Sequence, residues 1–511
     1  MNTKKIEAPY YPIVYVRGYA MRAADQEETF HDAYYGFSAS SVEIREASPK
    51  NGYQVVDIFE GQMIRFMKMR EYRYADSVNY GLNDFNENKS RSIWISRFYD
   101  QDVIQGKRRT IIDHATDLAR LIIEEIPEKL KSQGIENIDT DYKVILIAHS
   151  MGGLVCRALI QTILKDYASK SSVLPPAKYK DASAIIHKLV TMGTPHNGID
   201  MGNVPDWLEN SIIKALNPYD AGIFKAPAMR KYLSLNTKQA INSLGDSQFS
   251  IEKCLCVIGS DYLSYGDVKT LTGSYSDGLV KQENAFLISD TDSKGGIMPV
   301  PKKAYTANVH RAHSGNKGIV NSIETYENVQ RFLFGDMKVN IALTDVEITT
   351  KQESNIKYFY DFEFALSIRG TGVFLHRREQ EPCGNAYRYD RSKVPQSLQL
   401  HTAFLNSSLN IDPKDPFSYF VMKFKVFEFR TEDGFLWDYK YPSREIFAES
   451  LEIQICKNDD KSYAAGFRWL SEVNWNMSAL VMGETYKIPL RDTPSIKGFV
   501  ELSPNFFNNE Y

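Results

Sequence analysis

The sequence predicts an α/β fold with a largely parallel central sheet, followed by a second domain built as an antiparallel β-sandwich. Up to about residue 335, short apolar runs alternate with segments of helical periodicity, which is typical of βαβ units. From about residue 338, apolar residues instead recur at every second position, the period of a strand with one buried face. We therefore expect two domains, 1–336 and 337–511.

Short apolar runs mark the strands of the parallel sheet. Between the second and third of them, apolar residues recur at three- and four-residue spacing over residues 111–126, which predicts one face of a helix. Pro127 is expected to kink or end this helix, because proline lacks the backbone N–H and its ring clashes with the preceding turn. The predicted strands are 13–16, 93–95, 144–147, 185–190 and 254–258.

The second domain shows its alternation most clearly in SYFVMKFKVFEFR (residues 418–430), where Phe420, Met422, Phe424 and Val426 share one face. Clusters of Gly, Asn, Asp and Pro separate the runs, which favours an antiparallel sandwich. Further strands are predicted at 339–343, 357–368, 451–456 and 486–490.

Composition narrows the classes of function. The 511 residues carry 61 basic and 64 acidic side chains, a net charge of −3, so no overall positive field exists to hold a nucleic acid. The five cysteines show no CxxC pair, so we expect reduced thiols and neither a metal nor a cofactor. The N-terminus lacks an apolar signal segment, and the longest strongly apolar run, 144–148, is too short to span a bilayer. We expect a cytoplasmic protein, while export by a dedicated secretion system, peripheral membrane contact and the oligomeric state stay open.

The segment KVILIAHSMGGLVCRALIQTIL carries the strongest chemical signal. A buried strand runs into Ala148-His149-Ser150-Met151-Gly152 and directly into a helix, which is the pattern of a nucleophile elbow. This turn is so tight that small residues must stand two positions before and two after the serine, and Ala148 and Gly152 meet the requirement. Ser150 is therefore the candidate nucleophile.

A serine hydroxyl needs a histidine base and a carboxylate, which in this motif follow in the order Ser, acid, His. Asp277 stands in a turn after the strand at 254–258, and His310 and His313 lie in a loop before an amphipathic last helix. We predict Asp277 as the acid and His313 as the base, because His313 lies closest to the Ser-Gly loop that leads into that helix. His310 is the alternative base.

Together these segments resemble the α/β-hydrolase lipases and esterases. AHSMGGLVCR around Ser150, TMGTPHNG at 191–198, SDGLV around Asp277 and the HRAHSG loop occur in the family's order, over about residues 12 to 335. The similarity is greatest to bacterial triacylglycerol-lipase-like and inositol-deacylase-like serine hydrolases. It implies an α/β-hydrolase fold with cap or lid insertions, a Ser-His-Asp triad, a covalent acyl-enzyme and hydrolysis of a carboxylic ester.

Two backbone N–H groups bind the oxyanion in such enzymes, one of them from the residue after the nucleophile, here Met151. The second normally follows a His-Gly pair after the first strand. Here the pair is Arg17-Gly18, and the resemblance assigns the N–H to Tyr19. Arg17 departs from the family, either as a cation near the pocket or as a surface residue.

Other segments carry less specific expectations. His149 and His196 are expected to be structural, as in the resembling enzymes. The insertion at about 20–92 is expected to pack in the core or, alternatively, to line a hydrophobic acyl pocket. Residues 201–250 contain apolar helical pieces that are predicted to form a lid over an acyl site, with plain packing on the domain as the alternative.

We therefore expect a serine hydrolase that cleaves small-molecule or lipid esters. One alternative is a phospholipase or lipid deacylase whose β-domain docks at a membrane or partner through Trp437, Trp469 and Trp475, although these tryptophans would equally suit a sandwich core. An acyltransferase is a second alternative, because an alcohol can resolve the same acyl-enzyme. A catalytically degenerate hydrolase used as a binding module is the third.

Overall fold

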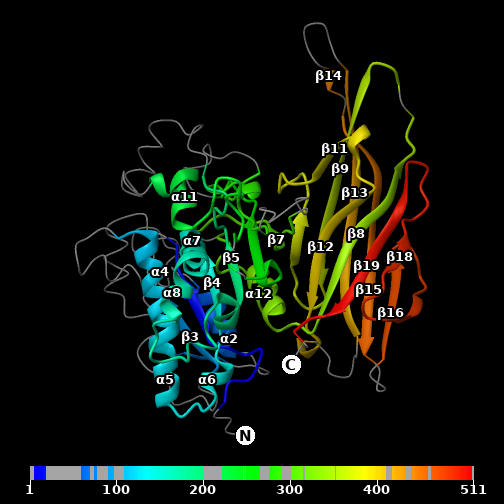
Figure 1. Ribbon diagram of the computed structural model, residues 1–511. Helices are drawn as coiled ribbons and strands as arrows, with labels where there is room; N and C mark the ends of the chain where they lie inside the picture. Colours follow the sequence, from blue (N-terminus) through cyan, green and yellow to red (C-terminus); the bar gives the residue numbers. More distant parts are fainter. Residues whose placement is uncertain are drawn as a thin grey trace, which may run out of the picture. The chain divides into compact units, whose positions relative to one another are not determined.

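The computed structural model describes residues 5–18, 59–68, 74–76, 90–96, 109–199, 221–245, 247, 249–264, 275–289, 301–314, 317–351, 353–409, 417–432, 439–440, 442–457 and 462–508. Its contacts divide the chain into two compact units (Figure 1). Unit 1 comprises Met1–Thr306 and Arg311–Ser322, and unit 2 comprises Ala307–His310 and Ile323–Tyr511. Helix α12 (Ile323–Phe334) groups with unit 2, and the domain boundary after residue 336 stays a prediction.

The central sheet has the strand order β2-β3-β1-β4-β5-β6-β7. Strand β1 pairs with β3 on one side and β4 on the other, and these pairs are parallel, as are β2–β3, β4–β5 and β5–β6. Every residue of β1, β3, β4, β5 and β6 is buried, as expected of parallel strands covered on both faces. The predicted parallel sheet is confirmed. Its strands are β1 (Ile13–Val16), β2 (Ala75–Asp76), β3 (Ser92–Ser96), β4 (Val144–His149), β5 (Ile186–Met192), β6 (Cys254–Gly259) and β7 (Tyr305–Val309).

Helix α4 (Ile111–Arg120) begins with a capping box, in which Thr110 and Asp113 satisfy each other's backbone N–H groups. Its predicted apolar face is buried. Of the two expectations for Pro127, the one that it ends the helix is wrong, and the one that it kinks the helix stays a prediction. A π-helical turn, η2 (Leu121–Glu125), precedes the proline, and α5 (Ile126–Ser132) continues, because the wider turn accommodates a residue without an N–H.

The remaining helices of unit 1 are mostly short. Helix α7 packs against α4 and against the sheet. Their bounds are α2 (Glu60–Lys68), α6 (Ile138–Asp141), α7 (Met151–Ala158), η3 (Leu159–Ile163), α8 (Leu164–Ala168), α9 (Ala182–Ile185), η4 (Ala221–Phe224), α11 (Ala226–Tyr232), η5 (Ile251–Lys253) and η7 (Gln282–Asn284).

The parallel register places the carboxyl ends of four strands at one edge of the sheet, where ligand sites of α/β proteins form. Gly18 follows β1, Ser150 follows β4 and Gly193 follows β5. Gly259 closes β6, and a Cβ atom on it would lie 2.7 Å from the Cβ of Asp277. The sheet thus brings residues distant in sequence to one edge.

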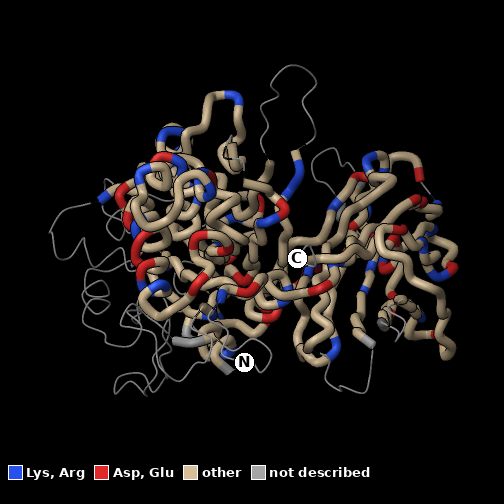
Figure 2. The backbone as a smooth tube through the Cα atoms, turned by 60° about the horizontal axis from the view of Figure 1, so that its bottom comes forward, with Lys and Arg blue, Asp and Glu red and all other residues tan. Residues whose placement is uncertain are grey.

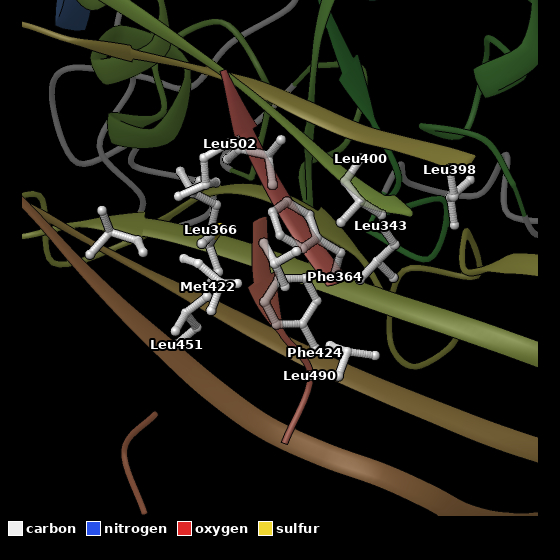
Figure 3. Packing of buried hydrophobic residues seen from close by; sticks show 14 of the residues in the cluster. Leu343, Phe364, Leu366, Leu398, Leu400, Met422, Phe424, Leu451, Leu490 and Leu502 are labelled. Carbon is white, nitrogen blue, oxygen red and sulfur yellow. The ribbon is translucent and has the colours of Figure 1, made fainter. Parts of the chain in front are cut away.

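Unit 2 contains two antiparallel sheets, and the predicted sandwich is confirmed. One has the order β10-β9-β13-β15-β16-β17, with β11 paired to β9 and β14 to β13, and the other has the order β12-β8-β19-β18. Apolar side chains of both sheets form one core, including Leu343 and Leu502 from one sheet and Phe364 and Met422 from the other (Figure 3). The strands are β8 (Met337–Ile348), β9 (Ile356–Ile368), β10 (Phe374–Arg378), β11 (Tyr387–Asp390), β12 (Ser397–Leu405), β13 (Phe417–Glu432), β14 (Tyr439–Lys440), β15 (Arg444–Lys457), β16 (Tyr463–Trp469), β17 (Asn476–Leu480), β18 (Tyr486–Pro489) and β19 (Ile496–Phe506), with short turns η8 (Arg391–Lys393) and η9 (Ser407–Leu409).

The alternating face of β13 is buried at Phe420, Met422, Phe424 and Val426, as predicted. The same face continues at Glu428, whose buried carboxylate accepts a 3.1 Å hydrogen bond from a tyrosine hydroxyl of β9. A buried carboxylate is tolerated there because it has a donor.

The tryptophans of unit 2 differ in their surroundings. Trp469 is buried and its ring contacts Phe424 and Phe447 in the core. Trp475 is half-buried beneath the guanidinium of Arg468, and Trp437 lies outside the described residues. Trp469 therefore belongs to the core of the sandwich, as the alternative interpretation of the tryptophans predicted.

Figure 2 shows basic and acidic residues interspersed along the described parts of both units. All five cysteines are buried, and burial raises the pKa of the Cys156 thiol. Within the described ranges, no helix is both long and apolar enough to cross a membrane.

Candidate active site

The turn between β4 and α7 holds Ser150 in a conformation that few non-glycine residues adopt. Its φ is +53° and its ψ is −128°, and its backbone N–H donates a 2.9 Å hydrogen bond to the carbonyl oxygen of Met192 on β5. A Cβ atom on Gly152 would collide with the carbonyl oxygens of Val16 and Arg17, so only glycine fits there. This is the sharp turn that raises a serine hydroxyl above a sheet.

The imidazole of His313 lies between Ser150 and Asp277. Its Nε2 is 3.0 Å from Ser150 Oγ, and its Nδ1 is 2.8 Å from Asp277 Oδ2. The side chains of His313 and Asp277 are only 4% and 2% exposed, which strengthens their electrostatic interaction. With Asp277 ionised, Nδ1–H donates to the carboxylate and Nε2 is left to accept the hydroxyl proton.

The carboxylate of Asp277 is oriented by its own loop. Oδ1 accepts hydrogen bonds of 3.0 Å and 2.7 Å from the N–H groups of Leu279 and Val280, which leaves Oδ2 for the histidine. Gly193 packs against the Asp277–His313 pair and has a backbone φ of +56°. A Cβ atom on it would lie 2.9 Å from Asp277 Oδ2 and 3.1 Å from His313 Nδ1.

The structure thus brings Ser150, Asp277 and His313 together in unit 1. The alternative base, His310, lies three residues earlier and belongs to unit 2. Within the described ranges, no group of three or more His, Cys, Asp or Glu side chains is placed to hold a metal ion.

Of the two predicted oxyanion donors, one can be located. Met151 is the first residue of α7, where a backbone N–H has no acceptor within the helix. Tyr19 lies outside the described residues. Gly18 is described, and a Cβ atom on it would lie 2.8 Å from the Cβ of Ser150, so the backbone of Gly18 lies directly against the nucleophile.

Arg17 is 2% exposed, so its interpretation as a surface residue is wrong. Its charge contributes to lowering the pKa of His149, the residue before the nucleophile. A buried cation therefore stands close to the elbow.

His149 and His196 are both buried, as expected of structural residues. Nε2 of His196 is 2.9 Å from the hydroxyl of Thr191 on β5. Burial is the main cause that lowers the pKa of each histidine well below 6.5, so both are neutral near pH 7.

Sequence reasoning missed the role of Arg157 on α7. Its side chain is completely buried, and it donates hydrogen bonds of 2.7–2.8 Å to the carbonyl oxygens of His196, Ile241 and Ser243. Burial lowers its pKa to about 10, so it is charged at neutral pH. The guanidinium thus links the 191–198 loop to the segment near residue 241. The sequence signal that could have indicated this role is a single arginine in an otherwise apolar helix.

The two predicted insertions are described only in part. In the first, Met63 and Phe66 of α2 are at most 1% exposed, which supports core packing, and Gln62 donates a 2.6 Å hydrogen bond to the carbonyl oxygen of Val320. In the predicted lid, residues 201–220 lie outside the described residues. The lid stays a prediction.

Part of the chain matches a known protein family. Residues 109–216 match a family described as "Putative serine esterase (DUF676)". This segment includes the elbow and the 191–198 loop and ends before Asp277 and His313. No curated protein sequence matches the chain.

Several solved structures are similar to the chain at low identity. Phospholipase PlaB from Legionella pneumophila is 12% identical, with a TM-score of 0.35, over 85% of this chain and 91% of that chain. The same phospholipase in complex with thio-NAD is 11% identical, with a TM-score of 0.31, over 84% and 91%. A Tle4-Tli4 complex is 14% identical, with a TM-score of 0.21, over 37% and 47%.

Proposed function

We propose that the protein is a serine hydrolase that cleaves carboxylic esters. The observation that carries this proposal is the hydrogen-bonded chain from Ser150 Oγ through the His313 imidazole to Asp277, with the serine at φ +53° in a strand-to-helix turn. A serine hydroxyl becomes nucleophilic when an adjacent base takes its proton.

In the proposed reaction, Ser150 Oγ attacks the ester carbonyl while His313 Nε2 takes the hydroxyl proton. The resulting imidazolium is stabilised by the Asp277 carboxylate, and the oxyanion is bound by the N–H groups of Met151 and Tyr19. His313 then gives the proton to the leaving alcohol, and an acyl-enzyme on Ser150 remains. A water molecule, deprotonated by His313, hydrolyses the acyl-enzyme.

The Ser150→Ala variant tests this proposal. We expect the parent protein to form one covalent adduct with a fluorophosphonate, measured by intact mass, and the variant to form none. Hydrolysis of p-nitrophenyl esters of increasing acyl length then separates esterase from lipase preference. A folded parent protein with neither adduct nor turnover would contradict the proposal and favour the binding-module alternative.

A phospholipase or lipid deacylase is the second candidate, and it is favoured by exposed apolar side chains in unit 2. Val473 is 85% exposed, and Leu470, Met477 and Val481, all within the same stretch of β16–β17 and its flanks, are 50–52% exposed. Where exposed apolar side chains form a contiguous patch, they often mark a lipid or protein contact. Co-sedimentation with phospholipid vesicles, comparing the parent with a Leu470→Ser/Val473→Ser variant, tests this candidate, and equal binding of both would contradict it.

An acyltransferase would use the same residues up to the acyl-enzyme. The two outcomes separate when turnover is measured with an added alcohol, because transfer yields a new ester in place of the free acid.

A further inference from the structure

His149, the residue before the nucleophile, makes a contact that the mechanism above does not use. It ends β4 and is 3% exposed. Its Nε2 lies 3.0 Å from the main-chain carbonyl oxygen of His313, and the two rings lie 4.9 Å apart with an interplanar angle of 41°. Because a carbonyl oxygen only accepts, Nε2 of His149 must carry the proton.

The surroundings of His149 favour this neutral tautomer. Burial, followed by the charges of His313 and Arg17, lowers its pKa, while the hydrogen bond to His313 acts in the opposite direction. Its Nδ1 is buried, and among the residues that the structure describes it has no hydrogen-bond partner. A Cβ atom on Gly18 would lie 3.2 Å from this nitrogen, so the backbone of Gly18 closes off that side of the ring.

The contact completes a clamp on the main chain of His313. The N–H of His313 donates a 2.8 Å hydrogen bond to the carbonyl oxygen of Asp277, and its carbonyl oxygen accepts from His149. His149 is covalently joined to Ser150. Its ring therefore links the residue that carries the hydroxyl to the residue that carries the imidazole.

We propose that His149 is a positioning residue, whose Nε2–H fixes the main chain of His313 so that the imidazole stays within hydrogen-bond distance of Ser150 Oγ. This inference rests on the proposed function of the same site. The hydrogen bond does not reach the substrate, so its loss lowers kcat and leaves KM nearly unchanged. Displacing a reacting group by about 1 Å costs on the order of 100-fold in rate.

Two substitutions separate the donor from the ring. His149→Phe keeps an aromatic ring against His313 and removes the donor. His149→Gln removes the ring and keeps an N–H donor at the end of a side chain of similar reach. The matched control is His187→Phe, because His187 is also a buried histidine of the sheet, lies at the amino end of β5 and packs against Tyr11.

The experiment measures kcat and KM for p-nitrophenyl butyrate, the rate constant of fluorophosphonate labelling and the unfolding temperature of each protein. We expect His149→Phe to lose about 100-fold in kcat and in labelling rate. His149→Gln should recover most of this loss, and His187→Phe should lose stability only. If His149→Phe does not fold, His149→Asn, whose amide stops short of the Nε2 position, replaces it and should show the same loss.

Three results have distinct meanings. An unlabelled parent protein contradicts the proposed function itself. A labelled parent with a donor-less variant that reacts equally fast overturns the positioning role and leaves the proposed function intact. Equal losses in His149→Gln and His149→Phe also overturn that role, because the hydrogen-bond donor would then be irrelevant.

Discussion

Asp277 and His313 are joined twice: the His313 main-chain N–H donates to the Asp277 carbonyl oxygen at 2.8 Å, and the His313 side chain contacts the Asp277 carboxylate, also at 2.8 Å. The main-chain bond fixes the distance between the two residues independently of the charge on either side chain. The carboxylate therefore acts on the imidazole alone, where it fixes the ring's tautomer and orientation.

Replacing Asp277 by asparagine tests this role. In Asp277→Asn the backbone bond is retained, but an amide can stabilise the wrong tautomer and cannot stabilise an imidazolium. We expect kcat to fall by about 10⁴-fold with little change in KM, a magnitude known for the equivalent change in another serine hydrolase. Ester hydrolysis measures it, and a loss below about tenfold would argue that Asp277 does not act in the reaction.

Gly193→Ala tests the packing behind the acid and the base. The new methyl group would stand 2.9 Å from Asp277 Oδ2 at a backbone φ of +56°, so the pair must move apart. Gly134→Ala is the matched control, because Gly134 has φ +83° but open space around it. Both variants should lose about 1 kcal/mol of stability from the left-handed backbone. Only Gly193→Ala should lose activity, and equal activity of both variants would refute this account of Gly193.

Arg157→Met tests the buried guanidinium. The substitution leaves the carbonyl oxygens of His196, Ile241 and Ser243 without their donor, so the free energy of unfolding should fall by about 3 kcal/mol or more. Arg120→Met is the control, because Arg120 is 45% exposed and its ion pairs lie at the surface, where they contribute at most about 1 kcal/mol. Urea unfolding compares the two, and equal midpoints would contradict the anchoring role.

Buried neutral histidines predict the dependence of stability on pH. Burial, the largest cause, lowers the pKa of His114 from 6.5 to about 4, and it also lowers the pKa of His187 and His196. Below pH 6.5 the unfolded chain therefore binds more protons than the folded chain, so the free energy of unfolding falls as the pH falls. For His114 this loss extends from about pH 6.5 to about pH 4.

Urea midpoints at pH 7.5 and pH 5.0 measure this effect. The parent protein should be less stable at pH 5.0, and His114→Gln should lose less over the same interval because it has one fewer group to protonate. A parent midpoint that stays constant or rises on acidification would show that these histidines are not buried in the neutral form.

Local patterns in the sequence were enough to predict the fold class. The strand-to-helix transition around Ser150 is contiguous in the chain, and the alternation of β13 appears within a few residues. Two local details differ from the simple patterns. The π-helical turn before Pro127 lets the helix continue, and the buried face of β13 continues at a charged residue, Glu428.

Features that depend on long-range packing could not be predicted. A lone arginine in an apolar helix marks Arg157 as unusual, but its acceptors, the carbonyl oxygens of His196 and Ile241, lie 39 and 84 positions away in the sequence. The contact of His149 with His313 joins residues 164 positions apart. The sequence shows the order of the motifs along the chain. Which of their atoms come into contact depends on the register of the sheet strands.

The central claim is that His313, and not His310, is the catalytic base, and one measurement tests it directly. Intact-mass analysis after fluorophosphonate treatment compares the parent protein with His313→Ala and His310→Ala. With His313 as the base, we expect a single adduct on Ser150 in the parent and in His310→Ala, and almost none in His313→Ala over the same time. Labelling of His313→Ala at the parental rate, or an adduct on a residue other than Ser150, would contradict it.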